Sequence, residues 1–340
     1  MLSKLNNITI PLLTKIKKIL SAFFKDVSAI LQQQPIKKII IGIIISIFLL
    51  YYPLGALLTH NIKTDTTYEP QTQKLASNTI DSLSYLIYQE VYENTWTPSL
   101  PFIFPASILD NMPSFQKGVI SAVQKTAAIL AQTQKSVIAS EDEHPLQKAA
   151  SLLKYPPTIW MFSPTNQLIP APSSNSQYRR ARKHLQKYNN LLSDSRAIFS
   201  LTPEGLGLTL QTIGSNLFNT AINIENYSRE HSGFIDTTSD EQFYFAQGQL
   251  FGYYIILKGI SADYKNIIID YNIYSQITAI QTALEKASLL KPLIIRNSDT
   301  QDIFGANHLF VISYYALKAS ALLQQVSSKL PHLNQQGNLL

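Results

Sequence analysis

Residues Ile39 to Leu58 read IIIGIIISIFLLYYPLGALL, twenty positions without a charged side chain. As a helix rising about 1.5 Å per residue, this run would span the roughly 30 Å hydrocarbon core of a bilayer. Its isoleucines, leucines and phenylalanine together favour insertion by about 4 to 8 kcal/mol. Pro53 does not overturn that balance, because transmembrane helices tolerate proline better than soluble helices do. The run predicts one membrane-spanning helix, with a buried core helix as the alternative.

The flanks of this run favour an uncleaved anchor over a signal peptide. The leader before it is 38 residues long, and no small-x-small cleavage pattern follows Leu58. Lys37 and Lys38 abut its N-terminal end, whereas charges of both signs follow its C-terminal end. The positive-inside bias then places the N-terminus in the cytoplasm and the rest of the chain across the membrane. We expect a cytoplasmic arm at 1–36, an anchor at 37–60, a large domain at 61–330 and a tail at 331–340.

The net charge of +6 is concentrated at the N-terminal end. Seven lysines and one aspartate precede Ile39, while 21 basic and 21 acidic residues follow it. The large domain therefore has no overall field to attract a polyanion, and we expect no nucleic-acid partner. Within the arm, apolar residues from Ile16 to Leu31 recur at helical spacing opposite the lysines, which predicts a helix lying on anionic lipid. Packing on the transmembrane helix of a partner protein is the alternative.

Several classes of chemistry are excluded or disfavoured by residue content. The chain has no cysteine, which rules out thiol catalysis, disulfides and cysteine-ligated metal centres. Walker phosphate loops, GxGxxG turns, GxSxG elbows and HExxH helices do not occur. The six histidines are scattered, and none lies three or four residues from another. We therefore expect no metal site and no cofactor.

Beyond the anchor, apolar residues recur at helical spacing and strand alternation is scarce. The pattern predicts an all-α fold, with the transmembrane helix followed by a multi-helix bundle. Gly248 and Gly252, four residues apart, would let a neighbouring helix approach closely. The expected helices lie near 75–91, 114–130, after Pro145, and near 178–192, 206–228, 240–261, 265–290 and 307–329.

Two segments interrupt the helical pattern. Four prolines between Thr97 and Phe115 forbid a continuous helix, so we expect an ordered loop that buries its apolar triplet at 102–104. In the second segment, Pro156 to Pro172, a short apolar run between prolines favours a strand over a turn of helix. A small β-hairpin is left open there, since two strands alone are marginal.

Four strings in and around these irregular segments resemble a known family. They are WTPSLPFIFPASILDNMPSFQ (96–116), YPPTIW (155–160), APSSNSQYRRAR (171–182) and NHL (307–309). They resemble domain-of-unknown-function family 2333, an uncharacterised family of Gram-negative bacteria, from the anchor to about Lys329. The resemblance implies a single-pass inner-membrane protein with a periplasmic helical domain. It implies no activity and no catalytic residues.

The candidate ligand contacts come from the loop and from the densest basic cluster of the domain. A polar pair ending an aromatic-lined loop is a plausible contact, although capping of the following helix is the simpler interpretation of both residues. Neighbouring arginines could hold lipid head groups or acidic glycans, although a solvated helix face is the simpler interpretation of them. The acidic run 141–143 before Pro145 is interpreted as helix capping. The candidates are Trp96, Asp110, Asn111, Arg179, Arg180 and His308.

Three functional hypotheses follow. The first is an envelope scaffold or binding module, with membrane lipids contacted through the anchor and arm and an envelope protein as a candidate partner. The second is binding of lipid or cell-wall glycan through Arg179, Arg180 and the 97–115 loop. The third is an unrecognised hydrolase that pairs Asp110 or another carboxylate with His308. Oligomeric state and ligand identity do not follow from the sequence.

Overall fold

The computed structural model describes residues 35–72, 75–134, 144–163, 166–230, 238–292 and 308–331, without the side chains of 35–39 and 162–169. The expected arm lies almost wholly outside the described residues, as do the acidic run 141–143, Asn307 and the tail beyond Pro331. The chain divides into two compact units, Met1–Leu57 and Leu58–Leu340.

The apolar run near the N-terminus is helical, as predicted. Helix α2 (Pro35–Thr59) contains Pro53 and is the one helix among the described residues long and apolar enough to cross a membrane. Its apolar part, Ile40–Thr59, has a mean hydropathy of 2.3, and only 6% of the most apolar window is buried.

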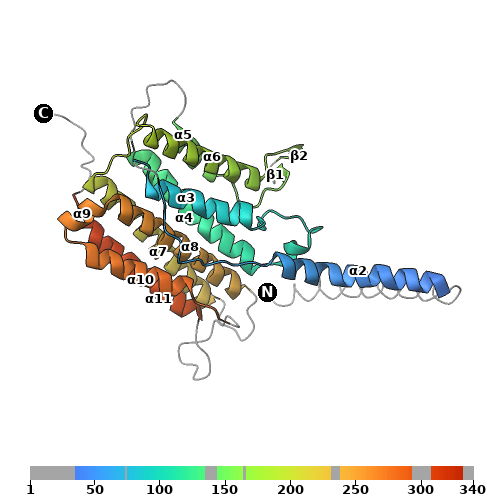
Figure 1. Ribbon diagram of the computed structural model, residues 1–340. Helices are drawn as coiled ribbons and strands as arrows, with labels where there is room; N and C mark the ends of the chain where they lie inside the picture. Colours follow the sequence, from blue (N-terminus) through green and yellow to red (C-terminus); the bar gives the residue numbers. More distant parts are fainter. Residues whose placement is uncertain are drawn as a thin grey trace. The chain divides into compact units, whose positions relative to one another are not determined.

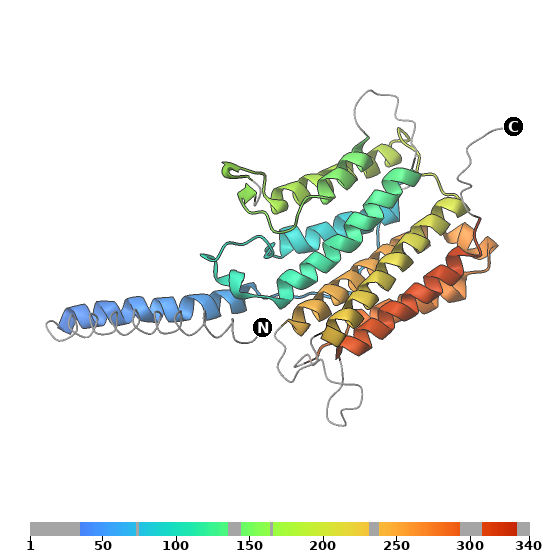
Figure 2. The same ribbon diagram turned by 180° about the vertical axis from the view of Figure 1, so that it is seen from behind.

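The second unit is a bundle of helices, which confirms the predicted all-α architecture (Figure 1). Pairs α5–α6, α3–α4, α7–α8 and α10–α11 follow one another across the bundle, as both views show (Figures 1 and 2). The helices are α3 (Asn78–Tyr88), α4 (Asn111–Thr133), α5 (Pro145–Leu153), α6 (Ser174–Ser193), α7 (Pro203–Glu230), α8 (Ser239–Asp263), α9 (Lys265–Asp270), α10 (Tyr274–Ser288) and α11 (His308–Ser327).

The two middle pairs meet through glycines on α4 and α8. A Cβ atom added at Gly248 would overlap the carbonyl oxygen of Phe115, and one at Gly118 would overlap that of Phe245. At Gly252 the added atom would lie 2.9 Å from the Cβ of Ala122. The close approach predicted for Gly248 and Gly252 is therefore confirmed, and the backbones of α4 and α8 touch where no side chain fits.

The N-terminus of α3 is fixed by the last residue of α8. The Asp263 carboxylate accepts hydrogen bonds from the backbone N–H and hydroxyl of Thr79 at 2.8 and 2.7 Å. It also accepts from the Ser77 hydroxyl and from both the backbone and side-chain N–H groups of Asn78, at 2.7 to 2.9 Å. A carboxylate at a helix N-terminus satisfies orphan N–H groups and complements the helix dipole. This contact sets the register of α3 against α8.

Two helices differ from the pattern expected from sequence. Helix α3 ends at Tyr88, and the chain continues as a π-helical turn, η1 (Gln89–Glu93). The expected helix over 265–290 is broken into α9 and α10, because Asn272 adopts a left-handed conformation with φ of 50°. Asparagine is one of the few residues that adopt this conformation readily.

The loop 97–110 corrects one expectation. Its middle forms a short 3₁₀ helix, η2 (Pro105–Ile108), in which Ala106 is buried, but the apolar triplet at 102–104 is not buried. Phe102, Ile103 and Phe104 are 80%, 52% and 36% exposed. The prolines restrict the backbone of this loop and prevent it from continuing as a helix that could pack these side chains into the bundle.

The segment after α5 contains the two strands of the structure's described part, β1 (Phe162–Ser163) and β2 (Asn166–Pro170). They pair antiparallel, with Phe162 opposite Pro170. The chain on either side of them is tied back to α6, because the Ser174 hydroxyl contacts the backbone of Pro156 and Ile159 at 2.6 to 2.9 Å.

Candidate functional site

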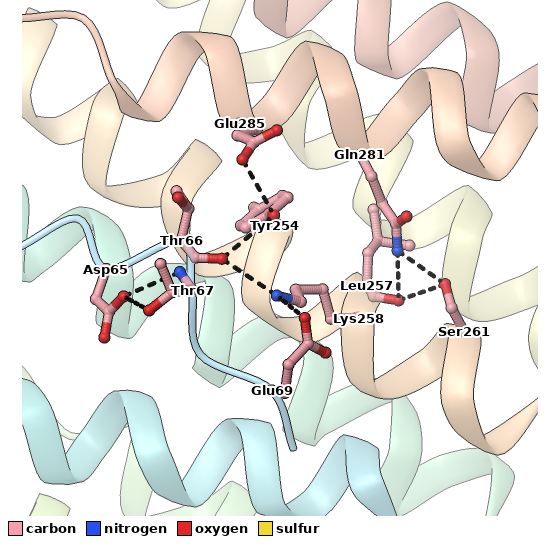
Figure 3. A network of polar contacts seen from close by, with 10 residues as sticks. All are labelled: Asp65, Thr66, Thr67, Glu69, Tyr254, Leu257, Lys258, Ser261, Gln281 and Glu285. Atoms are coloured by element: carbon pink, nitrogen blue, oxygen red, sulfur yellow. Dashed lines mark hydrogen bonds and ion pairs between the residues drawn. The ribbon is translucent and has the colours of Figure 1, made fainter.

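Residues 61–72, here called the strap, join the end of α2 to the bundle and lie along its surface. Lys258 of α8 donates to the Thr66 carbonyl at 3.1 Å and lies 2.6 Å from a Glu69 carboxylate oxygen (Figure 3). Tyr254, one turn earlier, donates to the same carbonyl at 3.4 Å and lies 3.5 Å from Glu285 of α10. The strap is therefore an ordered part of the domain.

Both ends of the strap are fastened as well. At its start, the Asn61 amide donates to Asn94 at 2.9 Å, and its backbone N–H points to the Met112 sulfur at 3.3 Å. Further along, the Tyr68 ring stacks on Tyr85 with centroids 3.7 Å apart, and the Tyr68 hydroxyl donates to Asp81 at 2.7 Å. The strap is consequently fixed to the bundle from Asn61 onward, two residues after α2 ends.

The start of the strap covers a buried carboxyl on the π-helical turn η1. Glu90 is 1% exposed, and neither carboxyl oxygen has a hydrogen-bond partner among the described residues. Burial raises the pKa of the Glu90 carboxyl to about 8, while the nearby Asn94 and Gln116 amides and Lys63 offset part of that rise. Desolvation favours the neutral form of a carboxyl, so Glu90 holds a proton at neutral pH.

Other polar atoms gather around this carboxyl. The Gln89 side chain donates to the Lys63 carbonyl at 2.7 Å, but its own amide oxygen has no partner among the described residues. In the part of the chain that the structure describes, the amide nitrogen of Asn94, which lies near Glu90, is also buried without a hydrogen-bond partner. π-Helical turns and unsatisfied buried polar groups both occur preferentially at functional sites.

Gln116 of α4 joins η1 to the loop 97–110. Its amide oxygen accepts from the backbone N–H and hydroxyl of Thr97, and its amide nitrogen donates to the carbonyls of Glu90 and Thr95. All four distances lie between 2.7 and 3.2 Å, and Gln116 is fully buried. Glu90 was not among the residues predicted from sequence, although its position three residues after Ile87, on the apolar stripe that continues from α3, was a usable signal.

Of the predicted ligand contacts, Trp96 is 1% exposed and packs inside the domain. Its indole N–H donates to the Pro157 carbonyl at 3.1 Å, and its ring meets Tyr178 edge-on with centroids 5.1 Å apart. Trp96 thus holds the two irregular segments together.

The basic cluster on α6 contacts η1. Arg179 donates to the Val91 carbonyl at 2.9 Å, and its guanidinium lies 4.2 Å from the centre of the Tyr92 ring. Arg182 donates to the Ser84 carbonyl at 3.2 Å and also lies over Tyr92. The two arginines therefore donate to carbonyls of α3 and η1 and stack on Tyr92 of η1. Arg180 is exposed and lies 3.5 Å from the Gln177 side chain.

Asp110 and Asn111 stand at the start of α4. Asp110 is the N-cap residue, and its carboxylate accepts from the Asn111 backbone N–H at 2.7 Å. His308 is the first residue of α11. Since α4 packs on α8 while α11 packs mainly on α7 and α10, Asp110 and His308 belong to different helix pairs. Their pairing in a hydrolytic site stays a prediction.

A groove lies elsewhere, between α10 and α11. It has a volume of about 410 Å³ and contains two lysines, two tyrosines and three hydroxyl side chains. Its lining residues are Ser275, Thr278, Ala279, Thr282, Ala283, Lys286, Tyr314, Tyr315 and Lys318. Across the described residues, no three His, Asp or Glu side chains gather closely enough to hold a metal ion.

Comparison with known proteins gives one match. No curated protein and no solved structure matches the chain. The family model that matches belongs to bacterial proteins without a described activity, and it spans the loop 97–110 from Leu100, α4, α5, α6 and much of α7. Residues 100–221 match the family described as an uncharacterised protein conserved in bacteria (DUF2333), which confirms the resemblance over that part of the chain.

Proposed function

We propose that the chain is a single-pass inner-membrane protein whose helical domain faces the periplasm and serves there as a scaffold or binding module. The observation that carries the proposal is the exposed apolar surface of Ile40–Thr59, which water would not tolerate as a free helix. Lys37 and Lys38 at its N-terminal end favour a cytoplasmic N-terminus.

Topology is tested with single thiols in the cysteine-free chain. Ser215→Cys places a thiol on an exposed position of α7, and Ser3→Cys places one near the N-terminus. Cells with a permeable outer layer are treated with a maleimide that cannot cross the inner membrane. We expect the Ser215→Cys variant to be labelled in intact cells and the Ser3→Cys variant only after lysis. The reverse pattern would contradict the proposed orientation, and an intact mass lacking the first sixty residues would show cleavage.

The binding role is supported by an exposed stripe on α11. Phe310, Tyr314 and Leu317 recur at helical spacing and are 60%, 50% and 39% exposed. Apolar residues in such a row are typical of a surface that another protein covers. A photo-crosslinker at Leu317 should give a discrete adduct to an envelope protein in cells, and one at Ser215 should not. Equal results at both positions would count against the scaffold role.

A second candidate function is recognition of an acidic glycan in the α10–α11 groove. Tyr314 and Tyr315 offer ring faces, Thr278 and Thr282 offer hydroxyls, and two lysines offer charge, a mixture suited to sugars bearing carboxylates. This groove differs from the site at Arg179 and Arg180 that the second hypothesis from sequence named.

The glycan hypothesis is tested by titrating the full chain in detergent with soluble muropeptides and with neutral chitin oligomers. We expect Lys286→Glu and Lys318→Glu to weaken muropeptide binding at least tenfold. Lys265→Glu, on the exposed side of α9, is the matched control and should change binding less than twofold. Equal affinity of wild type and groove variants would exclude this function for the groove.

A further inference from the structure

The loop 97–110 carries an apolar surface that the helices of the domain do not bury. Phe102 is 80% exposed, Ile103 52% and Ile108 56%, and Met161 of the second irregular segment is 44% exposed. We define the tip patch as these residues together with Phe104 and Trp160. Phe104 and Trp160 meet edge-on with ring centroids 6.0 Å apart, so the two segments form one surface.

The tip patch is held in shape. The Phe104 backbone N–H donates to the Pro101 carbonyl at 3.0 Å, and the Ser107 N–H donates to the Phe104 carbonyl at 3.0 Å. Pro101 and Pro105 restrict the backbone at both turns. An ordered loop that presents large apolar side chains outward is a surface prepared for an apolar environment, because its exposure is not a result of fraying.

The chain connection brings the tip patch within reach of the bilayer. Asn61, fastened to Asn94 and to the Met112 sulfur, follows the end of α2 at Thr59 by two residues. Two residues span at most about 7 Å. Met112 in turn stands just after the loop 97–110, at the start of α4. If α2 crosses the membrane, this end of the domain must lie near the point where α2 leaves it.

We infer that the tip patch inserts into the interfacial region of the leaflet from which α2 emerges, and that its partner is lipid. This inference rests on the proposed membrane anchor. The thirteen residues from Thr97 to Leu109 include no charged side chain, so insertion moves no charge out of water. Trp160 at the side of the patch is a residue type that prefers the membrane interface. The domain would then contact the bilayer at a second point and stand in a fixed orientation on it.

The chemistry of the patch also predicts which lipids matter. An apolar surface without lysine or arginine gains nothing from anionic head groups, so insertion should be the same in neutral and acidic bilayers and insensitive to salt. A basic surface would behave in the opposite way.

The test uses the full chain in phosphatidylethanolamine–phosphatidylcholine nanodiscs, labelled at one introduced cysteine with an environment-sensitive fluorophore. Phe102→Cys and Ile103→Cys report on the tip patch. Tyr274→Cys, 70% exposed at the start of α10, is the aqueous control, and Ile47→Cys in α2 is the membrane control. Lipids bearing a quencher near the glycerol level should reduce emission at positions 102 and 103 at least twofold more than at 274.

Each alternative outcome has a defined meaning. If position 47 is quenched but positions 102 and 103 are quenched no more than the aqueous control at 274, the inference is overturned and the anchor stands. Blue-shifted emission at 102 without lipid quenching would also overturn it, because a protein surface or a second copy then covers the patch. No quenching at 47 by lipids that carry the quencher on the acyl chain would overturn the anchor and with it the inference. Quenching at 102 that vanished at high salt would contradict the apolar mechanism.

Discussion

Lys258 of α8 and Glu69 of the strap lie 2.6 Å apart but differ in environment, with side chains 12% and 68% exposed. The lysine reaches the ion pair from a partly buried position over the Tyr254 ring, 5.4 Å from its centroid. The same ammonium donates to the Thr66 carbonyl (Figure 3). Lys258 is therefore held by three groups, whereas Glu69 contacts only Lys258 within the described part of the chain.

This difference predicts unequal effects of two substitutions. Glu69→Gln should lower the free energy of unfolding by less than about 1 kcal/mol, since exposed ion pairs contribute little. Lys258→Met should lower it by about 1 to 2 kcal/mol and loosen the strap, because the Thr66 carbonyl loses a donor. Urea unfolding of the full chain in detergent measures the free energy of unfolding of both variants. The rate of tryptic cleavage after Lys63 measures how far the strap has loosened in each. Identical results for both variants would show that the ion pair alone holds the strap.

Asp263 should matter far more than its neighbours in sequence. Asp263→Ala leaves the N–H groups of Asn78 and Thr79 without their acceptor, so we expect a loss of about 3 kcal/mol. Asp263→Asn should lower the free energy of unfolding by an amount between zero and the loss in Asp263→Ala. The amide oxygen of asparagine still accepts hydrogen bonds, but its NH₂ group would face other donors. Asp270→Ala, at the exposed end of α9, should cost less than about 0.5 kcal/mol. Thermal unfolding compares the three.

Glu90 predicts a pH dependence of stability with a defined sign. Its pKa is about 8 in the folded state and about 4.3 in an unfolded chain, so the folded state binds more protons between these values. Stability from this group is present at low pH and is lost as pH rises from about 5 to about 8. Each pKa unit corresponds to about 1.4 kcal/mol. Glu90→Gln should therefore be more stable than wild type at pH 8 by several kcal/mol and close to it at pH 5. A constant difference across that range would show that Glu90 does not titrate as described.

The α4–α8 contact predicts a strong effect of a single methyl group. Gly248→Ala places a Cβ on the Phe115 carbonyl, and backbone cannot move aside as a side chain can. We expect a loss of more than about 3 kcal/mol or failure to fold. Gly42→Ala in α2, where nothing lies within 4 Å of the added atom, should express and fold like wild type. Circular dichroism and size-exclusion chromatography of the purified proteins distinguish the two.

Helix positions were largely predictable because the helical repeat is a local property. The spacing of Tyr178, Leu185 and Tyr188 predicted α6, and all three are buried. Departures arose where one residue changed the backbone. The turn at Asn272 splits the last long stretch, and η1 extends the first helix with a wider turn. Neither leaves a clear mark in the apolar pattern.

The candidate site was less predictable, because burial of polar groups depends on distant segments. The sequence around Ser77 does not predict its contact with Asp263, which lies 186 residues away. Likewise, the sequence around Glu90 does not predict that Gln116 and the strap lie near it. Conversely, Phe102 and Ile103 have the composition of core residues but lie on the surface. Arg179 was singled out as a ligand contact, and tertiary packing uses it to cap the Val91 carbonyl.

The sequence by itself determined the apolar helix near the N-terminus, the asymmetric charge around it and the helical character of the domain. These follow from chain-local hydropathy, charge and periodicity. Only the tertiary structure decided that the linker is an ordered strap, that Glu90 is buried with a raised pKa, and that the tip patch is exposed. Such features depend on which surfaces the packed helices leave available, and that is set by contacts between residues far apart in the chain.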